Sequence, residues 1–221
     1  TAVALVPGGA QSAPGQPAAN LDQCRNGGFG DPPANCSGSA WVNGNLGAQQ
    51  AHYVEGYSVP YRAVLENLPL ATPIELTLGY DIKHSGKNAI DFLTHYDRLE
   101  PHSPFGHDAE DVSPTDGVFG VGGTTTTFLI PEPQAPSGGY FNALPAGERV
   151  MTLFGGTISN VEYVTEGSLG ASQSETRVKV TFTAASLTAV LAWGGHIARA
   201  ADWGVGNSAT GISGSPYHMR L

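Results

Sequence analysis

Positive charge is scarce in this chain of 221 residues, which has 10 Lys and Arg against 19 Asp and Glu and a formal net charge of −9. An acidic balance argues against binding to nucleic acid or anionic membranes, because both attract basic surfaces. The sequence also lacks the run of roughly 18 apolar residues that a membrane-spanning helix needs. We therefore expect a chain that neither binds nucleic acid nor spans a membrane.

Charged residues of either sign make up only 13% of the chain, whereas 30 Gly and 16 Pro, 46 residues together, make up a fifth of it. This composition disfavours long helices, coiled coils and α/β folds with many crossover helices. A chain of this length still buries roughly 70% of its unfolded surface, so one sizeable core is expected.

Sequence motifs of common enzymes are absent. The chain contains no G-x-S-x-G elbow, no P-loop and no H-E-x-x-H zinc motif, and its seven histidines are scattered. A hydrolase on a jelly-roll frame would need paired carboxylates across a cleft, and no such pair stands out. The sequence therefore predicts a protein that is not an enzyme.

Only two cysteines occur, Cys24 and Cys36, in a segment rich in Gly, Pro and Asn. We predict a disulfide, which would close a loop of about 13 residues and remove roughly 3 kcal/mol of unfolded-state entropy. A zinc pair is the alternative, but a closed zinc site needs four ligands at short spacings. A disulfide indicates an oxidising compartment, and Thr1 at the start is expected for a mature chain whose export signal has been removed. We expect an extracellular or cell-surface protein.

Apolar and polar residues alternate from Leu21 onward, as in half-buried strands. The alternation is clearest over residues 74–78 and 178–182. Further strands are expected over residues 40–43, 58–65, 124–130, 149–154, 157–165, 187–198 and 217–221. Turns rich in Gly and Pro separate them, which predicts an all-β fold, a β-sandwich or jelly roll, for a domain spanning residues 21–221. One short helix is expected over residues 88–98, because Ile90, Leu93 and Asp97 fall near one helical face.

Residues 1–20 form a predicted N-terminal tail, an apolar peptide followed by an uncharged linker. The apolar residues are Ala2, Val3, Ala4, Leu5 and Val6. A frayed terminus is one interpretation, since chain ends are often disordered. A donor strand is the other: a β-prone peptide on a flexible tether can add to the sheet of a neighbouring copy.

Calcium is the cofactor that the acidic residues suggest, because it takes six to eight oxygen ligands, often from Gly-rich loops. One group surrounds the turn at Gly86, and a second lies in the Pro-rich loop over residues 98–123. The first group is Asp81, Asn88, Asp91 and Asp97, and the second is Asp108, Glu110, Asp111 and Asp116. Neither group matches the ordered EF-hand loop, and a solvated acidic loop is the alternative.

Aromatic residues provide a second candidate site. Trp41 and Trp193 lie in apolar strand contexts and are expected in the core. Trp203 stands beside Asp202 and Gly204 and is the better candidate for stacking on a sugar ring. Glycans are therefore the second expected class of ligand.

Four segments carry a resemblance to a known family: SAWVNGNL at residues 39–46, GKNAIDFLT at 86–94, WGGHIAR at 193–199 and GSPYHMRL at 214–221. They resemble a poorly characterised family of secreted prokaryotic β-sandwich surface proteins, over about residues 21–221. The resemblance implies a surface role and carries no catalytic residues. In layout, the tail and sandwich also resemble subunits of donor-strand extracellular filaments and calcium-dependent tubules.

Two functions follow as expectations. The first is a structural subunit that polymerises outside the cell, head to tail with copies of itself, by donating its N-terminal strand, with calcium assisting. The second is a monomeric adhesin or carbohydrate-binding module that uses Trp203.

Overall fold

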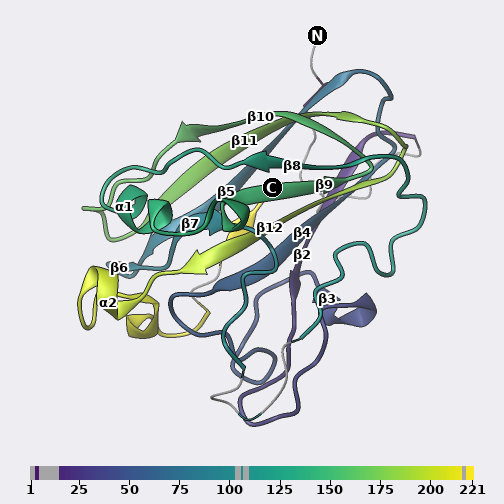
Figure 1. Ribbon diagram of the computed structural model, residues 1–221. Helices are drawn as coiled ribbons and strands as arrows, with labels where there is room; N and C mark the ends of the chain where they lie inside the picture. Colours follow the sequence, from purple (N-terminus) through teal and green to yellow (C-terminus); the bar gives the residue numbers. More distant parts are fainter. Residues whose placement is uncertain (1–2, 5–14, 103–105, 107–109, 216–217) are drawn as a thin grey trace.

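The computed structural model describes residues 3–4, 15–102, 106, 110–215 and 218–221. Two β-sheets pack face to face, with short helices and long loops at the ends of the strands (Figure 1). The predicted all-β sandwich is thereby confirmed.

The first sheet has the strand order β1-β5-β11-β10, and β6 and β13 also pair with β5. Its strands are β1 Val3–Ala4, β5 Pro73–His84, β6 Lys87–Asn88, β10 Gly156–Thr165, β11 Ser174–Ala184 and β13 Met219–Arg220. Every pairing in this sheet is antiparallel except that of β1, which runs parallel to β5.

The second sheet has the strand order β3-β2-β4-β12-β9-β8, and β7 also pairs with β12. Its strands are β2 Ala18–Cys24, β3 Trp41–Val42, β4 Ser58–Glu66, β7 Ile90–Thr94, β8 Thr125–Leu129, β9 Val150–Phe154 and β12 Ala189–Ile197. Strand β2 begins at Ala18, so the sheet starts within the segment that was expected to be linker.

The helices are all short: α1 Ser137–Asn142, α2 Ala200–Trp203, and the 3-10 turns η1 Gly38–Ala40, η3 Ala146–Glu148 and η4 Ala209–Gly211. The helix predicted over residues 88–98 is wrong, because Ile90–Thr94 form strand β7. All five residues of β7 are buried, since the strand lies against the fully buried strand β12. No helix in the described part of the chain is long and apolar enough to cross a membrane.

The core lies between the two sheets. In the first sheet, β11 and β5 place their apolar residues opposite one another, and each of these side chains is at most 1% exposed. The pairs are Val178 with Leu78, Val180 with Leu76, and Phe182 with Ile74. The apolar residues of the alternation predicted from the sequence therefore lie on the inward face of this sheet.

From the second sheet, Trp193 and Tyr61 enter the core as a stacked pair with ring centroids 6.0 Å apart. Trp193 is fully buried, and Trp41 is 6% exposed in a smaller cluster beside the disulfide. The core positions predicted for both tryptophans are confirmed.

The outer face of the second sheet is covered by the loop over residues 113–118. Arg62 on β4 forms an ion pair with Asp22 on β2 at 3.0 Å and donates hydrogen bonds to the carbonyls of Pro114 and Asp116. This loop explains why polar residues of β2 and β4 are buried.

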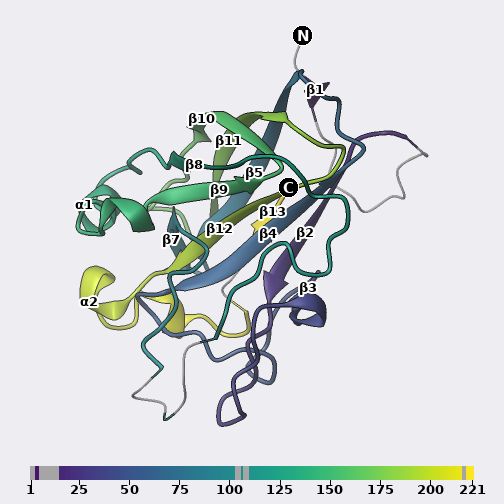
Figure 2. The same ribbon diagram turned by 45° about the vertical axis from the view of Figure 1, so that its right-hand side comes forward.

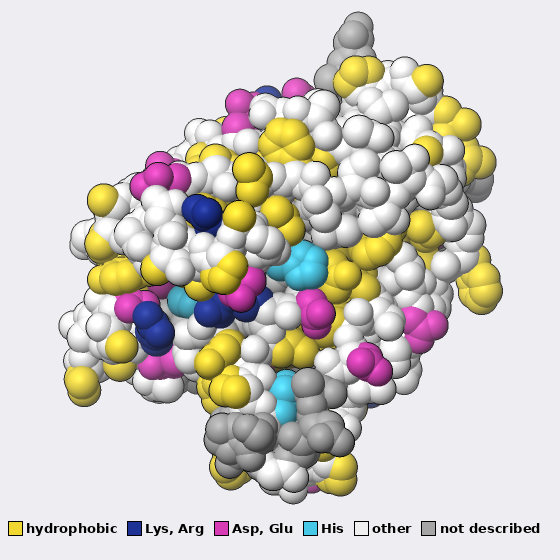
Figure 3. Space-filling model, in the orientation of Figure 1, with side chains coloured by type: hydrophobic (Ala, Val, Ile, Leu, Met, Phe, Trp, Pro, Cys, Tyr) yellow, Lys and Arg dark blue, Asp and Glu magenta, His cyan; other side chains and the backbone are white. Residues whose placement is uncertain are grey.

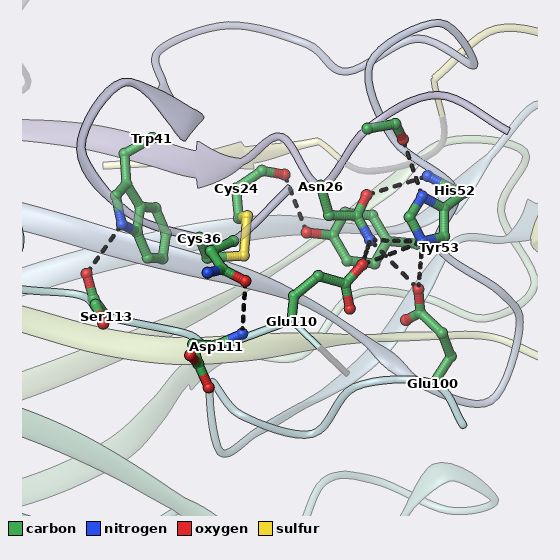
Figure 4. Close-up of a disulfide and its surroundings, with 12 residues drawn as sticks. Cys24, Asn26, Cys36, Trp41, His52, Tyr53, Glu100, Glu110, Asp111 and Ser113 are labelled. Carbon is green, nitrogen blue, oxygen red and sulfur yellow. Dashed lines mark hydrogen bonds and ion pairs between the residues drawn. A yellow bond between two sulfur atoms is a disulfide. The ribbon is translucent and has the colours of Figure 1, made fainter. Parts of the chain in front are cut away.

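The predicted disulfide between Cys24 and Cys36 is present, and both residues are fully buried. The Tyr53 hydroxyl donates to the carbonyl of Cys24, and the Cys36 amide donates to the carbonyl of Asp111. The disulfide thus fixes the end of β2 to the long loop that follows β7 (Figure 4).

Candidate functional site

The outer edge of β5 is covered by three very short strands instead of one long strand. β1 pairs at Ile74 and Glu75, β13 pairs at Gly79 and Tyr80, and the β6 hairpin strand pairs from Lys83 onward. Figure 2 shows β1 at one end of β5 and β13 further along. Among the described residues, no strand pairs with this edge between Glu75 and Gly79.

Of the residues predicted to form the donor strand, Val3 and Ala4 form β1, opposite Ile74 and Glu75 respectively. Ala2, Leu5 and Val6 lie outside the described residues. The structure therefore brings Val3 and Ala4 to a sheet edge of their own chain.

Charged residues hold β13 against β5. The Asp81 carboxylate on β5 contacts His218 at 2.9 Å and Arg220 at 2.6 Å. Burial opposes ionisation of Asp81, but the hydrogen bonds from Arg220 and His218 lower its pKa below the ordinary value. Arg220 also reaches Glu175 on β11 at 3.0 Å. The C-terminal strand is thus fixed by an ion-pair network.

Exposed apolar side chains flank the end of β5 at which β1 pairs. Leu70 is 52% exposed and Leu187 is 61% exposed. The two loops touch, because the Leu68 amide donates to the Leu187 carbonyl and Leu70 forms a bridge with Ala184. The upper right of the face in Figure 3 carries few charged side chains.

The first predicted calcium group is not brought together. Asp81 lies with His84 and His218, whereas Asp91 accepts hydrogen bonds from His196 at 2.5 Å and from the Trp203 indole at 2.8 Å. Asp97 belongs to no metal-ligand grouping of the described side chains, and burial raises its pKa. The Asn88 side chain donates to the carbonyl of Asn207.

The second predicted calcium group is divided as well. Asp111 and Asp116 are exposed and belong to no grouping of the described side chains, and Asp108 lies outside the described residues. Glu110 differs from them, because its side chain is only 1% exposed and it meets two histidines and a second glutamate.

We call this assembly the His52 cluster, which consists of His52, Glu100, His102 and Glu110. Its side chains are between 0% and 6% exposed. The His52 Nε2 atom lies 3.1 Å from Glu110 Oε1 and 3.6 Å from Glu100 Oε1, and His102 Nε2 lies 2.7 Å from Glu110 Oε2. Burial and the nearby Glu110 charge raise the pKa of Glu100 to about 7.

Asn26 connects the His52 cluster to the disulfide region (Figure 4). Its side-chain amide donates to Glu100 at 3.3 Å and to Glu110 at 3.2 Å, and its oxygen accepts from the His52 backbone amide. Sequence analysis singled out only Glu110 as a ligand of this cluster. Glu100 and His102 stand in the same Pro-rich loop, but His52 comes from a distant segment and reaches the site only through the fold.

Trp203, the predicted sugar-stacking residue, is half-buried. Its indole N–H donates to buried Asp91, and its ring lies edge-on to Tyr140 at 5.9 Å. Both contacts tie the side chain to the body of the protein.

Comparison of the chain with protein-family models, with curated protein sequences and with solved structures finds no match.

Proposed function

We propose that the protein is an extracellular structural subunit that polymerises by donating its N-terminal strand to the β5 edge of a neighbouring copy. The pairing of β1 with β5 carries the proposal, because two residues of the predicted donor peptide, Val3 and Ala4, lie along the outer edge of β5. The disulfide supports an oxidising, extracellular compartment.

Exchange between copies would reuse the contact that is made within one chain. Every copy presents the same edge, so the strand of one chain fits the next in the same parallel register, as in domain swapping. Residues 5–17 separate β1 from β2, and thirteen residues span at most about 47 Å. That reach is sufficient for the strand to leave its own sheet and bind a neighbour.

The exchanged state would be favoured over the closed chain because the donated strand would pair with more of β5 than β1 does. In the proposed complex, Leu5 would follow Ala4 and lie opposite Leu76, on the part of the edge between β1 and β13. Backbone hydrogen bonds would supply affinity and apolar side chains specificity, as in other strand additions. Because this contact is head to tail, it need not close on itself, and an open arrangement builds a filament.

Exposed apolar side chains at the same end of β5 support the same function. Leu70 and Leu187 are exposed there, and Leu70 bridges Ala184 at the end of β11. Covering two leucines contributes about 1.5–3 kcal/mol each before the ordering costs of association. Calcium is proposed only as an assisting ion that offsets the net charge between copies.

A mixing experiment tests the proposal directly. One batch carries Ala4→Cys and the other carries Glu75→Cys, each with its native disulfide intact. Paired strands lie about 4.8 Å apart, which allows a disulfide between directly opposed residues. After mixing and mild oxidation, we expect a cross-linked dimer of the two variants, identified by mass spectrometry, because strands exchange between copies.

The matched control replaces Glu75→Cys by Glu162→Cys on β10, at the far edge of the same sheet. Both glutamates pair with Lys179, so the two variants lose equivalent surface contacts. Equal yields of mixed dimer from the two pairs would refute strand exchange at β5. Negative-stain microscopy of the unmodified chain should show filaments, and the double variant Val3→Asp/Leu5→Asp should show none. Dispersed particles in both samples would favour a monomeric adhesin.

A further inference from the structure

We infer that the His52 cluster binds one divalent transition-metal ion, with zinc as the ion that the donor set fits best. This inference does not depend on strand exchange, because the cluster lies among the loops near the disulfide and not on the β5 edge.

The donor atoms match the preferences of zinc. Two imidazole nitrogens and two carboxylates are ligands that zinc takes at about 2.0–2.2 Å in a tetrahedral arrangement. Such a tetrahedron has edges of about 3.3 Å between ligand atoms. The separations from His52 Nε2 to Glu110 and Glu100, 3.1 Å and 3.6 Å, bracket that value. One donor atom from each of the four residues lies within 4.8 Å of the others, so small side-chain adjustments complete the site.

The orientation of the His52 ring also suits a metal ligand. Its Nδ1 atom lies 3.0 Å from the carbonyl oxygen of Gly27, and its Nε2 atom faces Glu100 and Glu110. A backbone carbonyl that orients the other ring nitrogen in this way is typical of zinc-binding histidines.

Burial of negative charge gives an independent reason. Glu100 and Glu110 are buried side by side, and the Oε2 atom of Glu100 is buried with no hydrogen-bond partner among the described residues. Asn26 provides one amide group to both carboxylates. Buried charges are normally paired or coordinate metals, and a divalent cation would neutralise the two carboxylates.

The second grouping of possible ligands consists of Asp81, His84 and His218, and its carboxylate needs no metal ion for charge balance. Arg220 already lies 2.6 Å from Asp81, and its fixed positive charge opposes a second cation. This grouping is therefore a suitable internal control.

The expected role of the ion is structural. Four protein ligands make a closed site, in contrast to catalytic zinc sites, which keep one position open. The ion would connect the segment at His52 with the two ends of the loop over residues 100–110. The disulfide holds the same loop through the Cys36–Asp111 hydrogen bond, so the ion would act as a second cross-link. His52 also lines a pocket of about 310 Å³.

A zinc titration tests the inference. The unmodified chain is first stripped of metal with a chelator, and its zinc affinity is then measured in competition with a chromogenic chelator. We expect one equivalent of zinc per chain and a rise in the unfolding temperature. The variant His102→Gln should bind at least 100-fold more weakly. The control variant His84→Ala/His218→Ala should bind like the unmodified chain, and so should Val3→Asp/Leu5→Asp, which separates this inference from the assembly proposal.

Cobalt loading of the unmodified chain gives a measurement that does not depend on a variant folding. Four-coordinate cobalt should give the intense visible bands of a tetrahedral site. Three results would each overturn the assignment. They are no zinc uptake by the unmodified chain, equal uptake by His102→Gln, and loss of uptake only in His84→Ala/His218→Ala.

Discussion

Asp91 shows how one residue can satisfy several buried partners in this molecule. It is fully buried, accepts from His196 Nδ1 and accepts from the Trp203 indole. The other nitrogen of His196 lies 3.0 Å from the Gly56 carbonyl, so both ring nitrogens face acceptors and both carry protons. Asp91 and His196 therefore form a buried ion pair, with the imidazolium stacked on Phe92 at 4.0 Å.

Replacement of Asp91 by Asn should destabilise the fold by about 3–5 kcal/mol, because it leaves the His196 charge buried without its counterion. The free energy of unfolding in urea measures the loss. Asp31→Asn, at an exposed position, is the matched control and should change stability by less than about 0.5 kcal/mol. A similar small effect for Asp91→Asn would show that the pair is not a stabilising ion pair.

The same residue shows why acidic composition is a weak guide to a metal site. Asp91 was grouped with Asp81 and Asp97 because the three are close in sequence, but each carboxylate has a different environment in the fold. Glu110 was grouped with the neighbouring acidic residues of its loop, whereas the fold places it beside Glu100 of the same loop and His52 of a distant segment. Local sequence patterns do not encode contacts between such distant segments.

At the scale of elements, alternation predicted most of the strands. Residues 58–65 correspond to β4 and residues 157–165 to β10, each within one residue at either end. Strand β2 was not predicted. Its polar residues Asp22 and Gln23 are buried, which removes the usual apolar and polar alternation. Strand β7 was taken for a helix because it is buried along its whole length, so its periodicity is uninformative.

The docking of β13 onto β5 should depend on pH through Asp81. Its pKa is lowered in the folded chain by Arg220 and His218, so ionised Asp81 contributes stability above the unfolded pKa of about 4. This contribution is lost as the pH falls through the lowered folded value. The groups that face Asp81 are His84, His218 and Arg220.

The difference in unfolding free energy between the unmodified chain and Asp81→Asn should therefore shrink as the pH falls below about 4. Hydrogen exchange of the Met219 and Arg220 amides should also become faster in the variant, because β13 loses its anchor. The exposed Asp111→Asn variant should show neither effect. A free-energy difference that persists unchanged to about pH 2 would argue against Asp81 as the anchor.

At the scale of the whole molecule, the proposed assembly must overcome a net charge of −9 on each copy. Like charges on neighbouring subunits repel, and added salt screens this repulsion. Raising sodium chloride from about 10 mM to about 150 mM shortens the Debye length from about 30 Å to about 8 Å. The strand contact itself consists of backbone hydrogen bonds and apolar burial, which salt does not weaken. Filament formation, followed by light scattering, should therefore begin at a lower protein concentration as salt is raised.

A comparison of calcium and sodium at equal ionic strength distinguishes charge screening from binding of calcium at a specific site. The quantity compared is the protein concentration at which filaments begin to form. If calcium acts only by reducing repulsion between copies, it should lower the threshold somewhat more than sodium, since a divalent ion accumulates more strongly at a negative surface. A calcium effect that saturates near one ion per chain would instead identify a specific site between subunits. The variant Val3→Asp/Leu5→Asp should not assemble with either ion, because screening of surface charge does not replace the apolar side chains that the donated strand has lost. Assembly that weakens as sodium chloride rises would show that attraction between charges, and not the donated strand, joins the copies.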